Sequence, residues 1–299
     1  MTFSIVARDP KTGHYGVAVQ SHFFSVGSRV PWARAGVGAV ATQALVEISY
    51  GPLGLDLLSS GKGARETLDA LKTIDPKVER RQVAMIDSHG EVAVHTGREC
   101  TPEAGYTVGD QFVCQANLMR TTNVWKEMAS TFESESSLDL PERLIATLEA
   151  GQRAGGDLRG MQSAAILVVD SKVSATGWQG VLVNLRVEDD RQPIAQLKRL
   201  LGLQRAYDLV DKAALLLSEG KTEESSKAYS IAAKLAPEVE ELQFWQSVSL
   251  VQASRLEEAR KIFSKVSEKN PDWIQVALNL QKVGRLPRGS LGSTDELSD

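Results

Sequence analysis

The chain has 299 residues, of which 42% are hydrophobic and 24% charged, and its formal net charge is −4. These values fit a globular protein of two domains with a substantial core, and they argue against the clustered basic face that binds nucleic acid. No run approaches the ~18 consecutive apolar residues of a membrane span. No basic segment followed by an apolar one opens the chain. We therefore expect a cytoplasmic protein with no membrane or nucleic-acid partner.

The inventory of cysteines, histidines and glycine motifs is poor. Two cysteines, Cys100 and Cys114, do not make a disulfide framework, and we interpret them as reduced thiols. The four histidines lack metal-ligand spacing, and no CxxC is present. Gly36-Val37-Gly38 and Gly61-Lys62-Gly63 lack the other residues of a dinucleotide or phosphate loop. We expect neither a metal nor a cofactor.

Alternating apolar residues predict a hairpin at the start of the chain, with strands over 2–8 and 15–21 around a turn rich in Pro, Asp and Gly. Because hairpins dominate the rest of this region, we expect mostly antiparallel sheets with helical layers, an α+β fold. The same patterns predict strands over 36–43, 82–87, 91–96, 111–118, 164–169 and 181–187, and helices over 64–71, 124–132 and 141–150.

The last third of the chain contains an internal repeat. Residues 220–224 align with 254–258, and Pro237 aligns with Pro271, at a constant offset of 34 residues. This is the tetratricopeptide period, although a generic helical bundle is the alternative. Two repeats are fewer than a free-standing array needs, so we expect support from capping helices over 194–202 and 273–282, the first domain or a second subunit. We expect turns between helices near 219–221, 237–239 and 253–255. The predicted domains are 1–201, a helical repeat over 202–286, and a disordered tail over 287–299.

Thr2 is the candidate nucleophile. An initiator methionine followed by a small residue is generally removed, so we expect Thr2 to become the N-terminus. An N-terminal threonine carries a hydroxyl nucleophile and an amine base on one residue. The amine's ordinary pKa of about 7.7–8.0 suits general-base catalysis near neutral pH. No histidine is then required.

Five stretches of the sequence resemble the bacterial and archaeal domain-of-unknown-function family 1028, which is Ntn-hydrolase-like. The resemblance extends over residues 2–201 and implies a four-layer αββα sandwich in which Thr2 is the N-terminal nucleophile. It supplies no substrate, and the helical repeat is an addition to it. The stretches are residues 2–9, 16–21, 30–43, 50–52 and 155–165.

Three further residues are candidates for assisting Thr2. Asn117 follows a strand, where its amide either donates to an oxyanion or bonds its own turn. Arg34 lies where proteasome-like relatives place a lysine; it cannot accept a proton, but its charge would lower the pKa of the Thr2 amine. Asp157 either orients that amine or forms a structural ion pair.

The remaining candidates bind substrate. Asp157 and Arg159 lie in a polar, glycine-rich loop and are suited to hold the polar ends of a substrate. The other candidates either belong to this loop or end strands that border the same cleft; they are Gln162, Ser163, Gln20, Ser21 and Gln43.

Two classes of function remain open. The first is an amidohydrolase that cleaves a small amide or peptide at Thr2. The second is a non-catalytic ligand-binding or assembly protein that binds a protein partner, or a second copy of itself, through the helical repeat. A cyclohydrolase-like enzyme on the same fold is a third option, because fold alone does not fix chemistry.

Overall fold

The computed structural model describes residues 2–173 and 180–292. The chain divides into two compact units, one ending at Leu201 and the other beginning at Gly202. The first unit contains two antiparallel sheets and is mixed α and β, as the hairpin pattern predicts. The second unit is helical. Each unit is described below by itself.

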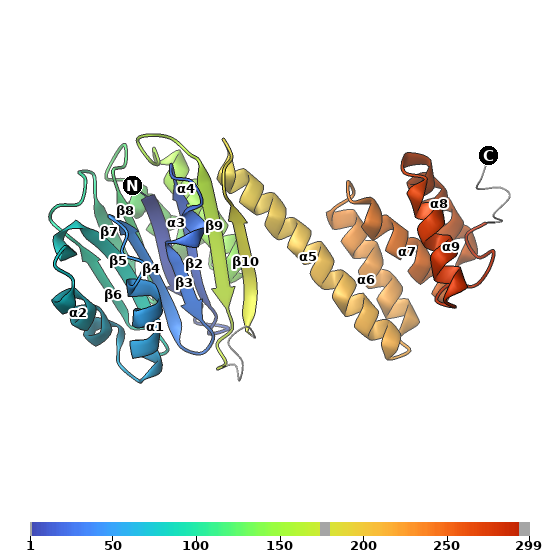
Figure 1. The fold of residues 1–299 in the computed structure, drawn as a ribbon, viewed down its shortest axis with the longest axis horizontal. Coiled ribbons are helices and arrows are strands. Elements are labelled where there is room, and N and C mark those ends of the chain that lie inside the picture. The colour runs from blue at the N-terminus through green and yellow to red at the C-terminus, as the bar shows by residue number, and fades with distance from the viewer. Residues whose placement is uncertain (1, 174–179, 293–299) are drawn as a thin grey trace. The chain divides into compact units, whose positions relative to one another are not determined.

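The first sheet has six strands in the order β10-β9-β2-β1-β8-β7 (Figure 1). Each neighbouring pair is antiparallel, and the N-terminal hairpin β1–β2 lies at its centre. The strands are β1 Thr2–Arg8, β2 Tyr15–Ser21, β7 Gly105–Gly109, β8 Phe112–Asn117, β9 Ser163–Val169 and β10 Val181–Val187.

The second sheet has four antiparallel strands in the order β3-β4-β5-β6. The sequence pattern missed β3, whose four residues are too few to show alternation, and β7, which begins and ends with glycine. The strands are β3 Pro31–Arg34, β4 Gly38–Ala44, β5 Arg81–Asp87 and β6 Val92–Thr96.

The two sheets face one another, and helices cover their outer faces. Val6, Val19 and Ile86 belong to the core between the sheets, whereas Phe3 and Met85, from the opposite faces, pack against helices. This alternation is the period of two expected for strands buried on both sides. The helices are α1 Tyr50–Ser59 and α2 Ala64–Ile74 on the second sheet, and α3 Val124–Ser134 and α4 Leu140–Arg153 on the first.

The segment Tyr50-Gly51-Pro52 begins helix α1 rather than merely interrupting the chain. Pro52 lies in the first turn, where its missing N–H leaves no helical hydrogen bond unmade. A Cβ at Gly51 would lie 2.3 Å from the ring of Trp32, so only glycine lets this helix pack on β3. The sequence stretches 30–43 and 50–52 are thus in contact.

Helix α5 (Pro193–Ser218) is much longer than the expected helix over 194–202. Its first residues, including Ile194 and Leu197, belong to the core of the first unit. Its later residues, including Ala206 and Ala213, belong to cores of the second unit. The remaining helices are α6 Thr222–Leu235, α7 Glu240–Gln252, α8 Leu256–Lys269 and α9 Asp272–Lys282.

The expected turns at 219–221, 237–239 and 253–255 all separate helices of the second unit. The prediction of a disordered tail is wrong for residues 287–292, because Leu291 is buried in a helical core and the Arg260 guanidinium donates to the Ser290 carbonyl. Residues 293–299 of that tail lie outside the described residues. No helix in the described part of the chain is long and apolar enough to cross a membrane.

A buried ion pair anchors the loop that follows β4. The Arg81 guanidinium donates to the Asp75 carboxylate at 2.8 Å and also to the Leu45 carbonyl. The Arg81 side chain is 6% exposed and the Asp75 side chain is 8% exposed. Burial raises the pKa of Asp75. Hydrogen bonds from Arg81 and from the Lys77 backbone lower this pKa by more, so it falls below its ordinary value of 3.8.

Replacing Asp75 by Asn should cost about 2–3 kcal/mol at neutral pH, because the buried Arg81 charge then keeps only the half-exposed Glu47 carboxylate, 3.6 Å away, as a partner. A carboxyl with a lowered folded pKa stabilises above its unfolded pKa, so the difference from wild type should shrink as pH falls below about 4. Native-state hydrogen exchange of the β4 and β5 amides measures this. Asp69→Asn, in an exposed pair with Lys72, should change stability by less than about 1 kcal/mol; equal effects would contradict the argument.

Candidate active site

A row of four polar residues crosses the first sheet at the start of β1. Strand register aligns Thr2 with Ser21 on β2 and with Asn117 on β8, and aligns Ser21 with Ser163 on β9. All four are buried, Thr2 at 4% exposure. They share the parity of Val6 and face the second sheet.

The second sheet presents its own polar row to this one. Gln43 on β4 aligns with Gln82 on β5, which aligns with Thr96 on β6. In the first sheet, two residues after Thr2 on β1, Ser4 aligns with Gln115 on β8. These five residues and the four of the first row form what we call the polar layer: Thr2, Ser4, Ser21, Gln43, Gln82, Thr96, Gln115, Asn117 and Ser163.

Gln82 is the centre of the hydrogen bonds in the polar layer. Its Nε2 donates to the carbonyls of Ala116 at 2.9 Å and Gly105 at 3.2 Å, both on the first sheet. Its Oε1 accepts from Gln43 Nε2 at 2.7 Å and from Asn117 Nδ2 at 2.8 Å. Because backbone carbonyls can only accept, these bonds fix which end of each amide is nitrogen.

Thr2 is held at both its side chain and its carbonyl. Its Oγ1 donates to Ser21 Oγ at 3.1 Å, and its carbonyl accepts from Gln43 Nε2 at 3.2 Å. The hydroxyl is therefore fixed at the end of the central strand. The predicted residues Ser21, Gln43 and Asn117 are brought to Thr2 by the structure.

Two buried acceptors in the polar layer have no hydrogen-bond partner among the residues that the structure describes. Asn117 Nδ2 is committed to Gln82, which leaves Asn117 Oδ1 unpaired, and Gln115 Oε1 is unpaired as well. An unsatisfied buried acceptor costs about 1–3 kcal/mol, so such atoms mark a place where a donor is expected to bind.

The glycine-rich loop ends close to Thr2. The Gln162 backbone N–H donates to the Ser21 carbonyl, and Gln162 Oε1 lies 3.2 Å from His22 Nδ1. Ser163 Oγ donates to the Phe23 carbonyl and accepts from Val26 N–H. Both residues therefore hold the chain that leaves β2, and Gln162 also donates to Asp189.

Asp157 is almost completely buried and saturated with donors. Its carboxylate accepts from the backbone N–H of His22 and of Arg159, and from Arg159 Nε and Nη2 at 3.1 and 2.8 Å. The structure therefore assigns Asp157 a structural part in shaping the loop. The Arg159 side chain, which is paired with this carboxylate, is 36% exposed.

The edge of the sandwich that holds Thr2, which we call the Thr2 edge, carries unusual backbone. Ala44 and Leu118, directly after Gln43 and Asn117, have φ of 70° and 55°. Ser25 and Glu103, in neighbouring loops, also have φ of 55°. Such conformations cost about 1–3 kcal/mol and cluster at functional sites. The Thr2 edge therefore carries strained backbone directly beside its polar side chains.

Arg34 and Gln20 do not join Thr2. Arg34 pairs in register with Gly38, at the opposite end of β4 from Gln43, and forms an exposed ion pair with Asp56 at 2.8 Å. The transfer by sequence position was wrong because β3 is antiparallel to β4 and carries Arg34 away. Gln20 points to the other face of β2, aligned with Phe3.

Ser4, Gln82 and Gln115 belong to the layer but were missed from the sequence. Gln115 is two residues before Asn117, so the shared parity was the signal that both face one side. Gln82 opens a predicted strand, and nothing local shows that it faces Thr2.

The functional groups of the polar layer are hydroxyls and neutral amides. Within the described residues, no group of three His, Cys, Asp or Glu side chains is placed to hold a metal ion. Cys114 is buried among apolar side chains, which raises the pKa of its thiol. Thr2 and Ser21 are thus the hydroxyls that meet at the Thr2 edge.

Comparison with protein families shows a match to a family of unknown function, DUF1028, over residues 2–197. The chain belongs to this family. A protein of the same family from Silicibacter pomeroyi, known from its crystal structure, is similar with a TM-score of 0.60 and 29% identity; the alignment covers 67% of this chain and 87% of that one. The DUF1028 match contains every residue of the polar layer.

A structure of Anbu, an ancestral β-subunit, from Yersinia bercovieri has a TM-score of 0.32 and 9% identity, covering 67% of this chain and 93% of that chain. This likeness is too low to carry an argument about the DUF1028 domain. No curated protein matches the chain.

The two buried glutamines Gln82 and Gln20 should respond oppositely to replacement by Met. Gln82→Met removes the partner of two carbonyls and two amides and should destabilise by about 3 kcal/mol or more. Both amide atoms of Gln20 lack a partner, so Gln20→Met should be neutral or stabilising by about 1 kcal/mol. Urea unfolding of both variants measures this, and similar losses would contradict the network.

Proposed function

We propose that this DUF1028 protein is an N-terminal-nucleophile amidohydrolase, with Thr2 as nucleophile after removal of Met1. The observation that carries the proposal is the Thr2 hydroxyl, fixed at the first position of the central strand within a polar layer. The helix–sheet–sheet–helix order of the first unit supports an Ntn-hydrolase-like sandwich.

The proposed reaction uses one residue as nucleophile and base. The Thr2 amine takes the hydroxyl proton as Oγ1 attacks the amide carbon, and the resulting ammonium returns the proton to the leaving nitrogen. An ester between Thr2 and the acyl group remains. Water then adds to that ester with the amine as base, which releases a carboxylate and restores the hydroxyl.

We assign Asn117 to orient the Thr2 amine rather than to donate to the oxyanion. Its Nδ2 is occupied by Gln82, whereas Oδ1 is a buried open acceptor on the strand residue aligned with Thr2. A free α-amine supplies donors that such an acceptor needs. Ser21 Oγ, which accepts from Thr2 Oγ1, sets the rotamer of the nucleophile.

The surroundings favour a substrate with an apolar part. Phe23, Leu45 and Leu158 are exposed on loops of the Thr2 edge. The Arg159 guanidinium lies on the same loop as Leu158 but is already paired with the Asp157 carboxylate. The substrate class that we propose is therefore a small peptide or acyl amide with an apolar side chain.

We further propose that the second unit is a tetratricopeptide-like extension in a cytoplasmic protein. Helices α6 and α8 begin 34 residues apart, at Thr222 and Leu256. The aligned residues Tyr229 and Phe263 are both buried, as stacked helix pairs require.

A non-catalytic binding protein is the second candidate. It is favoured by the burial of Thr2, whose hydroxyl already has a partner within the protein. The two candidates differ in whether a free Thr2 amine exists and whether Thr2 reacts.

The test combines intact mass with acylation by a β-lactone, which esterifies a nucleophilic hydroxyl. Purified protein should lack Met1 and gain one lactone adduct on Thr2. The rate of labelling should rise with pH through the amine's pKa, about 7.7–8.0, since only the neutral amine is a base. Thr2→Ala should abolish labelling, and Thr2→Ser should keep part of it.

Thr12→Ala is the matched control, because its hydroxyl donates to Asp9 in the turn between β1 and β2; it should label like wild type. Retained Met1, or undiminished labelling of Thr2→Ala, would remove the mechanism and leave the binding protein.

A further inference from the structure

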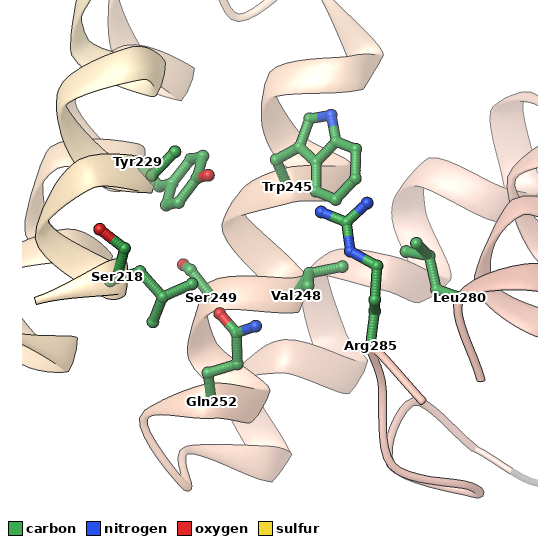
Figure 2. A pocket seen from close by; sticks show the side chains of 10 residues that line it. Ser218, Tyr229, Trp245, Val248, Ser249, Gln252, Leu280 and Arg285 are labelled. Atoms are coloured by element: carbon green, nitrogen blue, oxygen red, sulfur yellow. The ribbon is translucent and has the colours of Figure 1, made fainter. Parts of the chain in front are cut away.

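The helical unit contains a cavity of about 250 Å³ that the hydrolase proposal does not use. Figure 2 shows its side chains, which come from α5, α6, α7 and α9 and from the segment after α9. One part of its wall is apolar and aromatic, with Trp245, Val248 and Leu280, and the other part carries the polar side chains of Ser218, Ser249, Gln252 and Arg285. Small-molecule sites combine an apolar wall with a set of placed polar groups.

One cationic side chain, that of Arg285, follows the end of helix α9 and lines this cavity. Gly284, with φ of 71°, reverses the chain, while its N–H donates to the Gln281 carbonyl and the Arg285 N–H donates to the Leu280 carbonyl. These two bonds are those of a Schellman C-cap. The motif fixes the backbone of Arg285 against the helix, and the guanidinium points toward Trp245 (Figure 2).

Arg285 has no ion pair with any residue that the structure describes, and no carboxylate lines the cavity. The Arg285 charge acts on Tyr229, which lines the same cavity. Burial raises the pKa of the Tyr229 hydroxyl, and the Arg285 charge opposes that rise. Asp211, which is outside the lining, adds to the rise. A single cation matches a single negative charge, and a guanidinium can pair with a carboxylate through two parallel hydrogen bonds.

We infer that this cavity binds a small monocarboxylate with an apolar body. The carboxylate pairs with Arg285, and the apolar body lies against Trp245, Val248 and Leu280. Gln252 lines the cavity as well, and its amide can donate to the second carboxylate oxygen. The volume admits a ligand of about the size of phenylacetate, which is at the small end of ligand pockets.

The experiment titrates the full chain with phenylacetate and, as a matched uncharged probe, phenylacetamide, using calorimetry and the Trp245 indole resonance. Phenylacetate should bind saturably and shift that resonance, and the amide should bind about tenfold or more weakly. Arg285→Gln should weaken phenylacetate by about tenfold or more, the loss expected for one charge-assisted hydrogen bond.

Arg288→Gln is the control, because Arg288 is also exposed and lies outside the cavity; it should bind phenylacetate like wild type. Val248→Trp, which fills the cavity, should abolish binding. Equal binding of acid and amide, no saturable binding of phenylacetate, or undiminished binding by Arg285→Gln would each overturn the proposal. None of these outcomes depends on Thr2, so the hydrolase proposal is tested separately.

Discussion

The side-chain amide of Gln82 is the interaction on which the interior of the first unit depends. It lies on the second sheet, yet its nitrogen donates to two backbone carbonyls of the first. Gln43 and Gln115 reach across in the same way, to the carbonyls of Thr2 and Ala41. Elsewhere the sheets meet through apolar side chains, which pack without a directional requirement. At the Thr2 edge the sheets are joined by directional hydrogen bonds, which fix their relative position there and hold Thr2 at its place in the layer.

Burying this many polar groups is costly unless each finds a partner. A purely structural sandwich would extend its apolar core to the edge, as the Val6 and Val17 end does. The chain instead maintains a polar layer and strained residues such as Ala44 and Leu118 at the same edge. Two independent costs therefore coincide at one place. The proposed function would account for both, because it needs a site that holds a hydroxyl in a fixed orientation.

The sequence predicted the strands well because burial on both faces leaves regular alternation and clear turn residues between strands. It predicted that Ser21, Gln43 and Asn117 would lie near Thr2, because each lies at the end of a strand on the edge where β1 begins. It failed for Arg34 because sequence distance from Thr2 says nothing about which end of β4 the residue reaches. It failed for Gln20 because one step along a strand reverses the face. The role of Gln82 could not be predicted from the sequence, since its partners are backbone carbonyls that lie 23 and 34 residues away along the chain.

Two hydrogen-bond acceptors of the polar layer have no partner within the described residues. Every donor amide of Gln43, Gln82 and Asn117 is used, but Asn117 Oδ1 and Gln115 Oε1 are left without a partner. Turning either amide would not help, because Gln82 Oε1 and the Ala41 carbonyl need the nitrogens they already have. The missing component is therefore a donor from outside the layer. A free α-amine on Thr2 would be such a donor at Asn117, since the two residues are aligned on adjacent strands. Processing of the N-terminus would then complete the layer as well as create the base, so assembly of the site and its activation would be one event.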